Sequence, residues 1–289
     1  YQGAAKQLSL ALKIHPLKMQ DYLLPLGQAQ RQAKNYPDAQ SALEKFLTMV
    51  PNDFAGMKEL GQVYKEMNQP QKALDIFLKC ATAKPMDMDV PRWAADLAFD
   101  QKNYGVAVTF YEALKTANKL EPADWINLGK SYYEAKKFPE AVSTLQAALE
   151  KDSNLKGVRP ILAAIAVAEN RLPDAVTLYH DELSLSPDDE ALKNSFGETC
   201  LNAGLAMRQQ KKLADASQYF QLGLTAASVS SANLSYNLAA VYAQQRKAKD
   251  AITNLSAAIQ KDPAMKASAK SDASFASLKK NPAYLKLLK

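Results

Sequence analysis

Three asparagines occupy the same place in a phrase that recurs along the chain: Asn127 in INLG, Asn202 in LNAG and Asn237 in YNLA. Each stands two residues before the second member of a pair of small or apolar residues. The side-chain amide of asparagine carries hydrogen-bond donors and an acceptor, so it can pair with a peptide group of an extended ligand whatever the ligand's sequence. The recurrence predicts that these residues hold a partner's backbone, with solvated helix surface as the alternative.

Residue types that support catalysis or bind metals are sparse and do not form motifs. The two histidines, His15 and His180, lie far apart with no paired Cys or Asp motif, and the glycines stand singly rather than in a phosphate-binding loop. The two cysteines, Cys80 and Cys200, are too few for a disulfide framework, and we expect two buried free thiols. The sequence therefore predicts a protein that is not an enzyme and that needs no cofactor and no metal.

The positive charge of the chain is concentrated at one end. The 289 residues carry a formal net charge of +6, but residues 266–289 hold six lysines and one aspartate, which leaves about +1 for the rest. A nucleic-acid-binding protein typically carries a basic stripe along its binding face. We therefore expect no nucleic-acid partner, and we assign the basic tail to a solvated surface.

Nothing in the sequence predicts a direct membrane span, because no apolar run approaches the required length. The first residue is Tyr1, so an upstream signal or anchor could have been removed. The compartment stays open between the cytoplasm and, after removal of a signal, the periplasm.

The elements that position the asparagines belong to an internal repeat. Seven alanines follow turn-like phrases at intervals of 34 residues, with one interval of 41 and a last one of 35: Ala39, Ala73, Ala107, Ala141, Ala175, Ala216 and Ala251. A small pair precedes each alanine by twelve or thirteen residues, and a large apolar residue follows it by four. This apolar spacing predicts two amphipathic helices per repeat, which bury their apolar faces by stacking on the next repeat.

The pattern resembles the tetratricopeptide repeat (TPR) family. The best-matching repeat has the family's residue types at Trp125, Leu128, Gly129, Tyr132, Ala141, Leu145 and Ala148. The resemblance covers nearly the whole chain and implies an all-α fold, a right-handed superhelical solenoid of helix-turn-helix repeats.

We expect four segments on this basis. Residues 1–19 form the second helix of a truncated repeat, 20–189 form five repeats of 34 residues, 190–265 form two more, and 266–289 form a helical cap. The 41-residue interval predicts one long first helix from about Asp188 to Gln210, with Ser186 as its N-terminal cap. In the cap we expect Phe275, Leu278, Tyr284, Leu285 and Leu288 to cover the last exposed core.

In this family the first helix of each repeat lines the inner face, so the resemblance places the residues around each small pair in a groove. The predicted peptide-binding residues are Asn127, Asn202, Asn237, Ile126, Lys130, Ile161, Leu201, Leu205 and Tyr236, with Pro160 and Val167 at similar offsets. Exposed apolar surface of this kind suggests a binding face; the alternative is that neighbouring repeats or the last helix fill it. The corresponding N-terminal positions are charged and of mixed sign, as at Lys58, Glu59 and Arg92.

The functional hypothesis is a non-enzymatic interaction scaffold that binds a protein or peptide partner in its groove. A homo-oligomerising module is one alternative, because Leu8 and Leu12 of the first helix could dock in a neighbouring copy. A targeting domain of a larger enzyme is another. The partner cannot be named from these residues.

Overall fold

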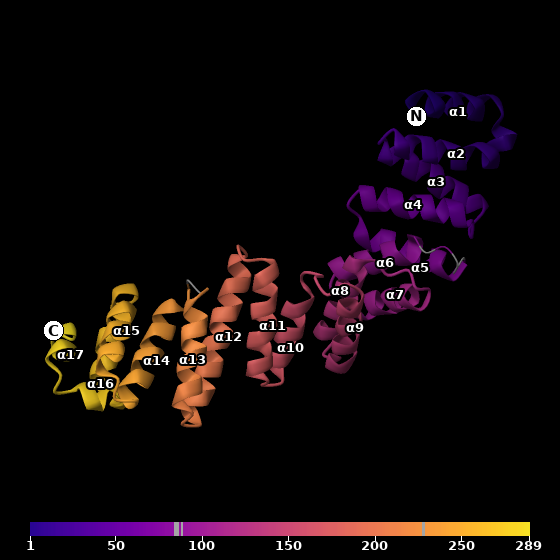
Figure 1. The fold of residues 1–289 in the computed structure, drawn as a ribbon. Helices are drawn as coiled ribbons and strands as arrows, with labels where there is room; N and C mark the ends of the chain where they lie inside the picture. The colour runs from indigo at the N-terminus through magenta and orange to yellow at the C-terminus, as the bar shows by residue number, and fades with distance from the viewer. Residues whose placement is uncertain (84–86, 88, 227–228) are drawn as a thin grey trace. The chain divides into compact units, whose positions relative to one another are not determined.

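The computed structural model describes residues 1–83, 87, 89–226 and 229–289 of the chain (Figure 1). Within these residues the secondary structure is helical, and successive helices pair into antiparallel hairpins joined by short turns. The chain divides into two compact units, Tyr1–Thr144 and Leu145–Lys289, and the boundary falls inside one helix. The all-α repeat fold expected from the sequence is confirmed.

The first unit contains α1 to α8 and the beginning of α9. Its helices are α1 (Gln2–Ile14), η1 (Pro16–Lys18), α2 (Met19–Gln32), α3 (Tyr36–Met49), α4 (Phe54–Glu66), α5 (Pro70–Ala83), α6 (Asp89–Asp100), α7 (Tyr104–Thr116), α8 (Pro122–Glu134) and α9 (Phe138–Lys151).

The second unit contains the rest of α9 and the remaining helices. These are α10 (Val158–Ala168), α11 (Leu172–Leu185), α12 (Glu190–Gln209), α13 (Leu213–Leu224), α14 (Ser231–Gln244), α15 (Ala248–Lys261), α16 (Met265–Ser271), η2 (Ala273–Leu278) and α17 (Pro282–Leu287). In each hairpin we call the even-numbered helix, from α2 to α14, the first helix.

The repeat register is held by close packing between the two helices of a hairpin. All seven register alanines are fully buried. A Cβ added to Gly61 of α4 would lie 2.3 Å from Cε1 of Phe77 of α5, and a Cβ added to Gly204 of α12 would lie 2.3 Å from Cε1 of Phe220 of α13. Only a residue without a side chain lets these buried rings lie against the backbone of the first helix.

Each first helix ends in the same turn. The residue after the helix cap has a left-handed backbone with φ between 55° and 61°, although none of the seven is glycine: Lys34, Asn68, Lys102, Lys136, Asn170, Lys211 and Arg246. The next residue donates its N–H to a carbonyl five residues back, as from Lys212 to Met207 at 2.9 Å. This is the Schellman pattern, which satisfies carbonyls that the helix end leaves open. Lysine and arginine suit the position because cations are favoured at helix C-termini.

The long helix of the sixth hairpin begins later than expected. Asp189, not Ser186, is its N-terminal cap, because the Asp189 carboxylate accepts the N–H of Leu192. Ser186 instead ends α11, where its N–H donates to the carbonyl of Glu182. The assignment of Ser186 as a cap was wrong because three candidate cap residues, Ser186, Asp188 and Asp189, stand close together, and sequence alone does not rank them.

The two ends of the chain differ from expectation in single residues. Leu8 and Leu12, which the sequence suggested as contacts for a second copy, are half-buried against a cluster that includes Leu23 and Phe46. In the C-terminal segment Phe275, Leu278, Tyr284 and Leu288 are buried against α14 and α15. Leu285 is 48% exposed, and its expected burial was wrong.

The contact between Gly61 and Phe77 gives a stability prediction. We expect Gly61→Ala to destabilise the first unit by about 1–3 kcal/mol, because overpacking forces a buried ring to move. Urea unfolding followed by circular dichroism measures the effect. Gly105 of α7 is the matched control, since a Cβ there meets nothing within 4 Å, and Gly105→Ala should be neutral or stabilise by up to about 1 kcal/mol. Equal effects of both substitutions would contradict the packing role of Gly61.

Candidate interaction surface

Asn127 lies on α8 and takes part in a hydrogen-bonded chain within the first unit. It is half-buried, and its Nδ2 donates to the hydroxyl of Tyr111 at 3.1 Å. That hydroxyl donates in turn to Asp96 Oδ1 at 2.7 Å. Burial and the Asp96 carboxylate raise the pKa of Tyr111 above its usual value, so the phenol stays protonated and donating. Asn127 therefore uses one of its two N–H groups inside the protein.

The neighbours of Asn127 on α8 form a mixed surface. Ile126 is half-buried and Lys130 is exposed, with its ammonium group 5.6 Å from the centre of the Phe99 ring. The face therefore combines an aliphatic side chain, an amide and a cation held near an aromatic ring.

Asn202 on α12 in the second unit has a different environment. It is exposed, and its amide has no hydrogen-bond partner among the residues that the structure describes. Leu201 is half-buried against a core cluster that contains Phe220 and Leu234, whereas Leu205 is 40% exposed. An unpaired amide thus stands between a partly buried and an exposed leucine.

On α10 the predicted apolar positions are also partly accessible. Pro160 and Ile161 are half-buried, and Val167 is 37% exposed. Large apolar side chains at this level of exposure are few in the described parts of the chain.

Asn237 and Tyr236 on α14 are engaged by other parts of the second unit. Asn237 donates to the carbonyl of Asn233 at 2.9 Å and accepts from Arg208 Nη1 at 2.9 Å. Tyr236 donates to Asp272 Oδ2 at 3.0 Å, and its ring lies edge-on to Phe275 with centroids 5.6 Å apart. At this repeat the C-terminal segment occupies the face, which corresponds to the alternative kept open for the groove residues.

The mixed charges of the first unit pair with one another from one repeat to the next. Arg31 contacts Glu59 at 2.6 Å, Lys58 contacts Asp87 at 2.9 Å, and Arg92 contacts Asp124 at 3.2 Å and also Glu121. These partners lie 28 to 32 residues apart in sequence, close to one repeat length. Sequence reasoning listed several of these charges but missed their pairing, which opposite charges at that spacing could have suggested.

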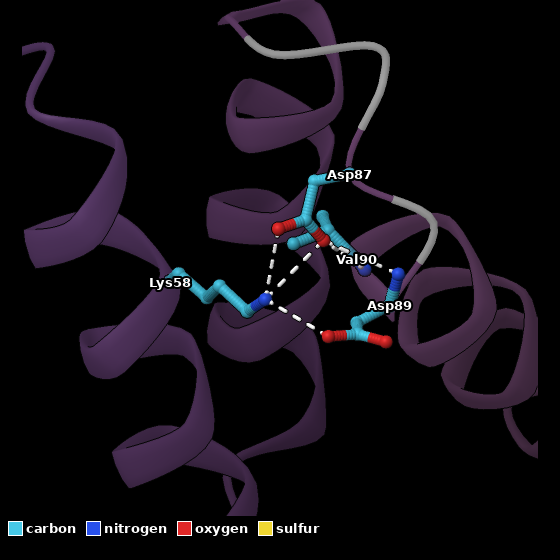
Figure 2. Close-up of polar contacts among 4 residues, drawn as sticks. All are labelled: Lys58, Asp87, Asp89 and Val90. Atoms are coloured by element: carbon cyan, nitrogen blue, oxygen red, sulfur yellow. Dashed lines mark hydrogen bonds and ion pairs between the residues drawn. The ribbon is translucent and has the colours of Figure 1, made fainter.

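Lys58 is the centre of the cluster drawn in Figure 2. Its ammonium group donates to both oxygens of Asp87, at 3.2 and 2.9 Å, and to Asp89 Oδ2 at 3.1 Å. Asp87 also accepts the backbone N–H groups of Asp89 and Val90 at the start of α6. Burial opposes ionisation of Asp87, but these donors outweigh it and hold the pKa of its carboxyl below the usual value.

The second unit also contains an open recess of about 600 Å³ at the end of α12. It is lined by Leu205, Arg208, Gln209, Lys211, Leu213 and Gln244. Only Leu205 of this set was predicted as a binding residue. Arg208, Gln209, Lys211 and Leu213 lie in or beside the turn between α12 and α13, and Gln244 ends α14, so all five are away from the small pair that guided the sequence prediction.

The described residues lack the features of a metal site and of a membrane span. They contain no group of three or more His, Cys, Asp or Glu side chains placed to hold a metal ion. Among their helices, none combines the length and the apolar character that crossing a membrane requires. Cys80 and Cys200 are buried free thiols, as expected; burial raises their pKa values to about 11 and about 12.

Comparison with known proteins agrees with this architecture. The tetratricopeptide repeat family model matches residues 24–85 and 126–190. The peroxisomal targeting signal receptor of Saccharomyces cerevisiae is 24% identical over 213 residues, which cover 70% of this chain and 34% of the receptor. The chain therefore spans about a third of the length of that relative.

Solved structures show the same fold at low sequence identity. A tetratricopeptide repeat protein from Parabacteroides merdae has a TM-score of 0.52 at 15% identity, with 88% of this chain and 98% of that chain covered. The structure of Naa15/Naa10 bound to HypK-THB has a TM-score of 0.64 at 15% identity, with 98% of this chain and 43% of that chain covered.

The hairpin repeat, the buried register alanines and these matches define the fold as a tetratricopeptide repeat solenoid, and the family model over residues 24–85 and 126–190 supports a protein of that family. Proteins of this family generally mediate protein–protein interactions and are typically non-enzymatic.

The Lys58 cluster yields a pH-dependent prediction. Asp87→Asn should lower the stability of the first unit by about 1–2 kcal/mol at neutral pH, because it removes charge-assisted hydrogen bonds. A lowered pKa in the folded state gives stability that is present above the unfolded pKa of about 3.9 and is lost as pH falls through the folded value. The difference in unfolding free energy between Asp87→Asn and the unmodified chain should therefore become smaller in acid.

The measurement is the urea midpoint by circular dichroism across this pH range. Asp89→Asn is the control, because Asp89 is 70% exposed and should contribute less than about 0.5 kcal/mol. If the stability difference between Asp87→Asn and the unmodified chain stayed constant as the pH fell, the electrostatic explanation would be contradicted.

Proposed function

We propose that this protein is a non-enzymatic interaction protein that binds an extended segment of a partner along the faces of its first helices. The observation that carries the proposal is Asn202, an exposed amide without a partner in the described structure, between Leu201 and Leu205. An amide in this state can donate to and accept from one peptide group without first breaking a bond inside the protein.

The apolar neighbours supply the second part of the argument. Leu205 on α12 and Val167 on α10 keep 40% and 37% of their surface exposed, and Ile161 is half-buried on α10. Covering the exposed part of one such side chain stabilises a complex by about 1 kcal/mol. A partner segment with apolar side chains would gain from these positions, while Asn202 would bind its backbone.

The first unit offers a separate contact surface on α8. Asn127 gives one N–H to Tyr111, which leaves its second N–H and its carbonyl oxygen for a ligand. Ile126 and Lys130 flank it with an aliphatic and a cationic side chain. We include this surface in the proposal as a second contact for the same class of ligand.

Asn237 and Tyr236 enter the proposal in another role. Because their polar groups bind Arg208 and Asp272, they act as positioning residues for α12 and for the C-terminal segment. The yeast relative is, by its name, a receptor for a targeting signal, and this supports recognition of a segment in the present chain as well.

The test is selection of peptides from a random display library on the intact chain, followed by affinity measurement on variants. We expect Leu205→Ala and Asn202→Ala each to weaken binding of selected peptides by about tenfold, the size of one lost hydrogen bond or apolar contact. Leu285→Ala is the matched control, since Leu285 of α17 is exposed to a similar extent. Thermal melts check that each variant is folded.

Selected peptides whose affinity is unchanged by both α12 substitutions, or changed equally by Leu285→Ala, would refute binding on this face.

A further inference from the structure

We propose that the recess at the end of α12 binds an acidic segment of a partner protein that places one apolar side chain in the recess and carboxylates beside it. This inference rests on the proposed function and adds the chemistry of the partner. It concerns the second unit alone.

The lining of the recess combines two kinds of contact. Leu205 and Leu213 offer apolar surface, and Leu213 is itself packed on the core cluster around Phe220. Arg208 and Lys211 stand at the same opening and bring two positive charges. An apolar side chain of the ligand fits the leucines, and a carboxylate next to it fits the guanidinium, whose planar fork matches two oxygens.

Arg208 differs from the first-helix cations of the first unit in what it binds. Arg31, Lys58 and Arg92 are each paired with a carboxylate. The hydrogen-bond acceptors of Arg208 are neutral: they are the side-chain amide oxygen Oδ1 of Asn237 and the hydroxyl of Ser274. These two bonds fix the guanidinium at the recess, and its charge has no ion pair among the residues that the structure describes.

Asp272, an acid whose charge interacts with that of Arg208, is already engaged. Asp272 accepts the N–H of Ser274 at 2.8 Å and the hydroxyl of Tyr236 at 3.0 Å. Burial opposes ionisation of Asp272, but its hydrogen bonds with Ser274 and Tyr236, followed by the charge of Arg208, hold its pKa below the usual value. Asp272 and Arg208 do not form an ion pair. A ligand carboxylate would be the first one in ion-pair contact with Arg208.

Further cations extend the charge beyond the recess along what we call the basic edge. The turns after α12 and α14 and the turn between η2 and α17 supply its members: Lys211, Lys212, Arg246, Lys247, Lys279 and Lys280. Ser277 donates to the carbonyl of Ala243 at 2.8 Å, which brings the η2 turn to the end of α14.

None of these six cations forms an ion pair within the described residues, and the acids of the adjoining first turns are Asp215 and Asp250. A surface with this excess of positive charge attracts acidic partners and speeds their association.

The apolar part of the recess favours a protein segment over nucleic acid. A nucleic acid would use the cations for its phosphates but would have no use for Leu205 and Leu213. We therefore commit to an acidic peptide and make nucleic acid one outcome of the test.

The probes are three fluorescein-labelled ligands measured by anisotropy on the full chain. The first is a peptide with a central leucine flanked by glutamates, the second replaces each glutamate by glutamine, and the third is a short DNA duplex. We expect the glutamate peptide to bind at least about tenfold more tightly than the glutamine peptide at low salt. This advantage should fall as NaCl rises from about 50 to about 300 mM, because salt screens the exposed charges.

Two variants locate the site. Arg208→Gln should weaken binding of the glutamate peptide about tenfold. Because Arg208 also holds Ser274, a second variant, Lys211→Asn, removes charge without breaking that bond. Lys211 is exposed and has a left-handed backbone, a conformation that asparagine tolerates. Lys102→Asn, which removes an exposed lysine at the equivalent left-handed turn of the first unit, is the control and should leave affinity unchanged.

Equal binding of the glutamate and glutamine peptides, no binding of the glutamate peptide, or full affinity in both variants would overturn the inference. So would tighter binding of DNA that is independent of Leu205. The proposed function has a separate readout: library peptides that depend on Leu205 but lack acidic residues would leave it standing and refute only the acidic partner.

Discussion

The structure depends on the close approach of two helices within each hairpin. Where the first helix has glycine, as at Gly61 and Gly204, the buried ring of Phe77 or Phe220 lies directly against its backbone. On the second helix, the fully buried register alanines likewise keep the two helices close, because their side chains are small. Because this contact sets the distance and rotation of the pair, it also decides which side chains of the first helix can point away from the core. Asn202 and Leu205 are exposed because their helix is held by Gly204 between them.

The spacing of the alanines predicted the hairpins correctly. Each hairpin needs a small buried residue where its two helices meet, so the alanine recurs in the sequence of every repeat. Single-residue assignments were less secure where several residues could serve. Asp189 caps α12 in place of Ser186, and Leu285 turns outward while its neighbours in the cap are buried. Which residue caps a helix, or which side chain of a short helix is buried, depends on how the neighbouring elements pack around it.

The three asparagines show why equivalent sequence positions need not be equivalent sites. Asn127 meets Tyr111 of the preceding hairpin, Asn237 meets Arg208 of α12, and Asn202 meets neither kind of partner in the described structure. The difference lies in residues sixteen or more positions away, so it is invisible in the local phrase. The ion pairs of the first unit are also invisible in a local phrase, because their two members are separated by almost a full repeat. Sequence reasoning thus identified a candidate face but could not tell which parts of it were already occupied.

The left-handed residue that ends each first helix has a consequence for how such a chain can change. Lysine, arginine and asparagine all stand at this position, and in every case the backbone bonds that close the turn are the same. The side chain points outward and makes no demand on the core, so its identity is nearly independent of the fold. Each hairpin therefore carries one exposed position whose charge can change: five of the seven hold lysine or arginine, and two hold asparagine. Substitution at these positions alone would change the surface charge of one hairpin turn after another within each unit, while every helix stays in place.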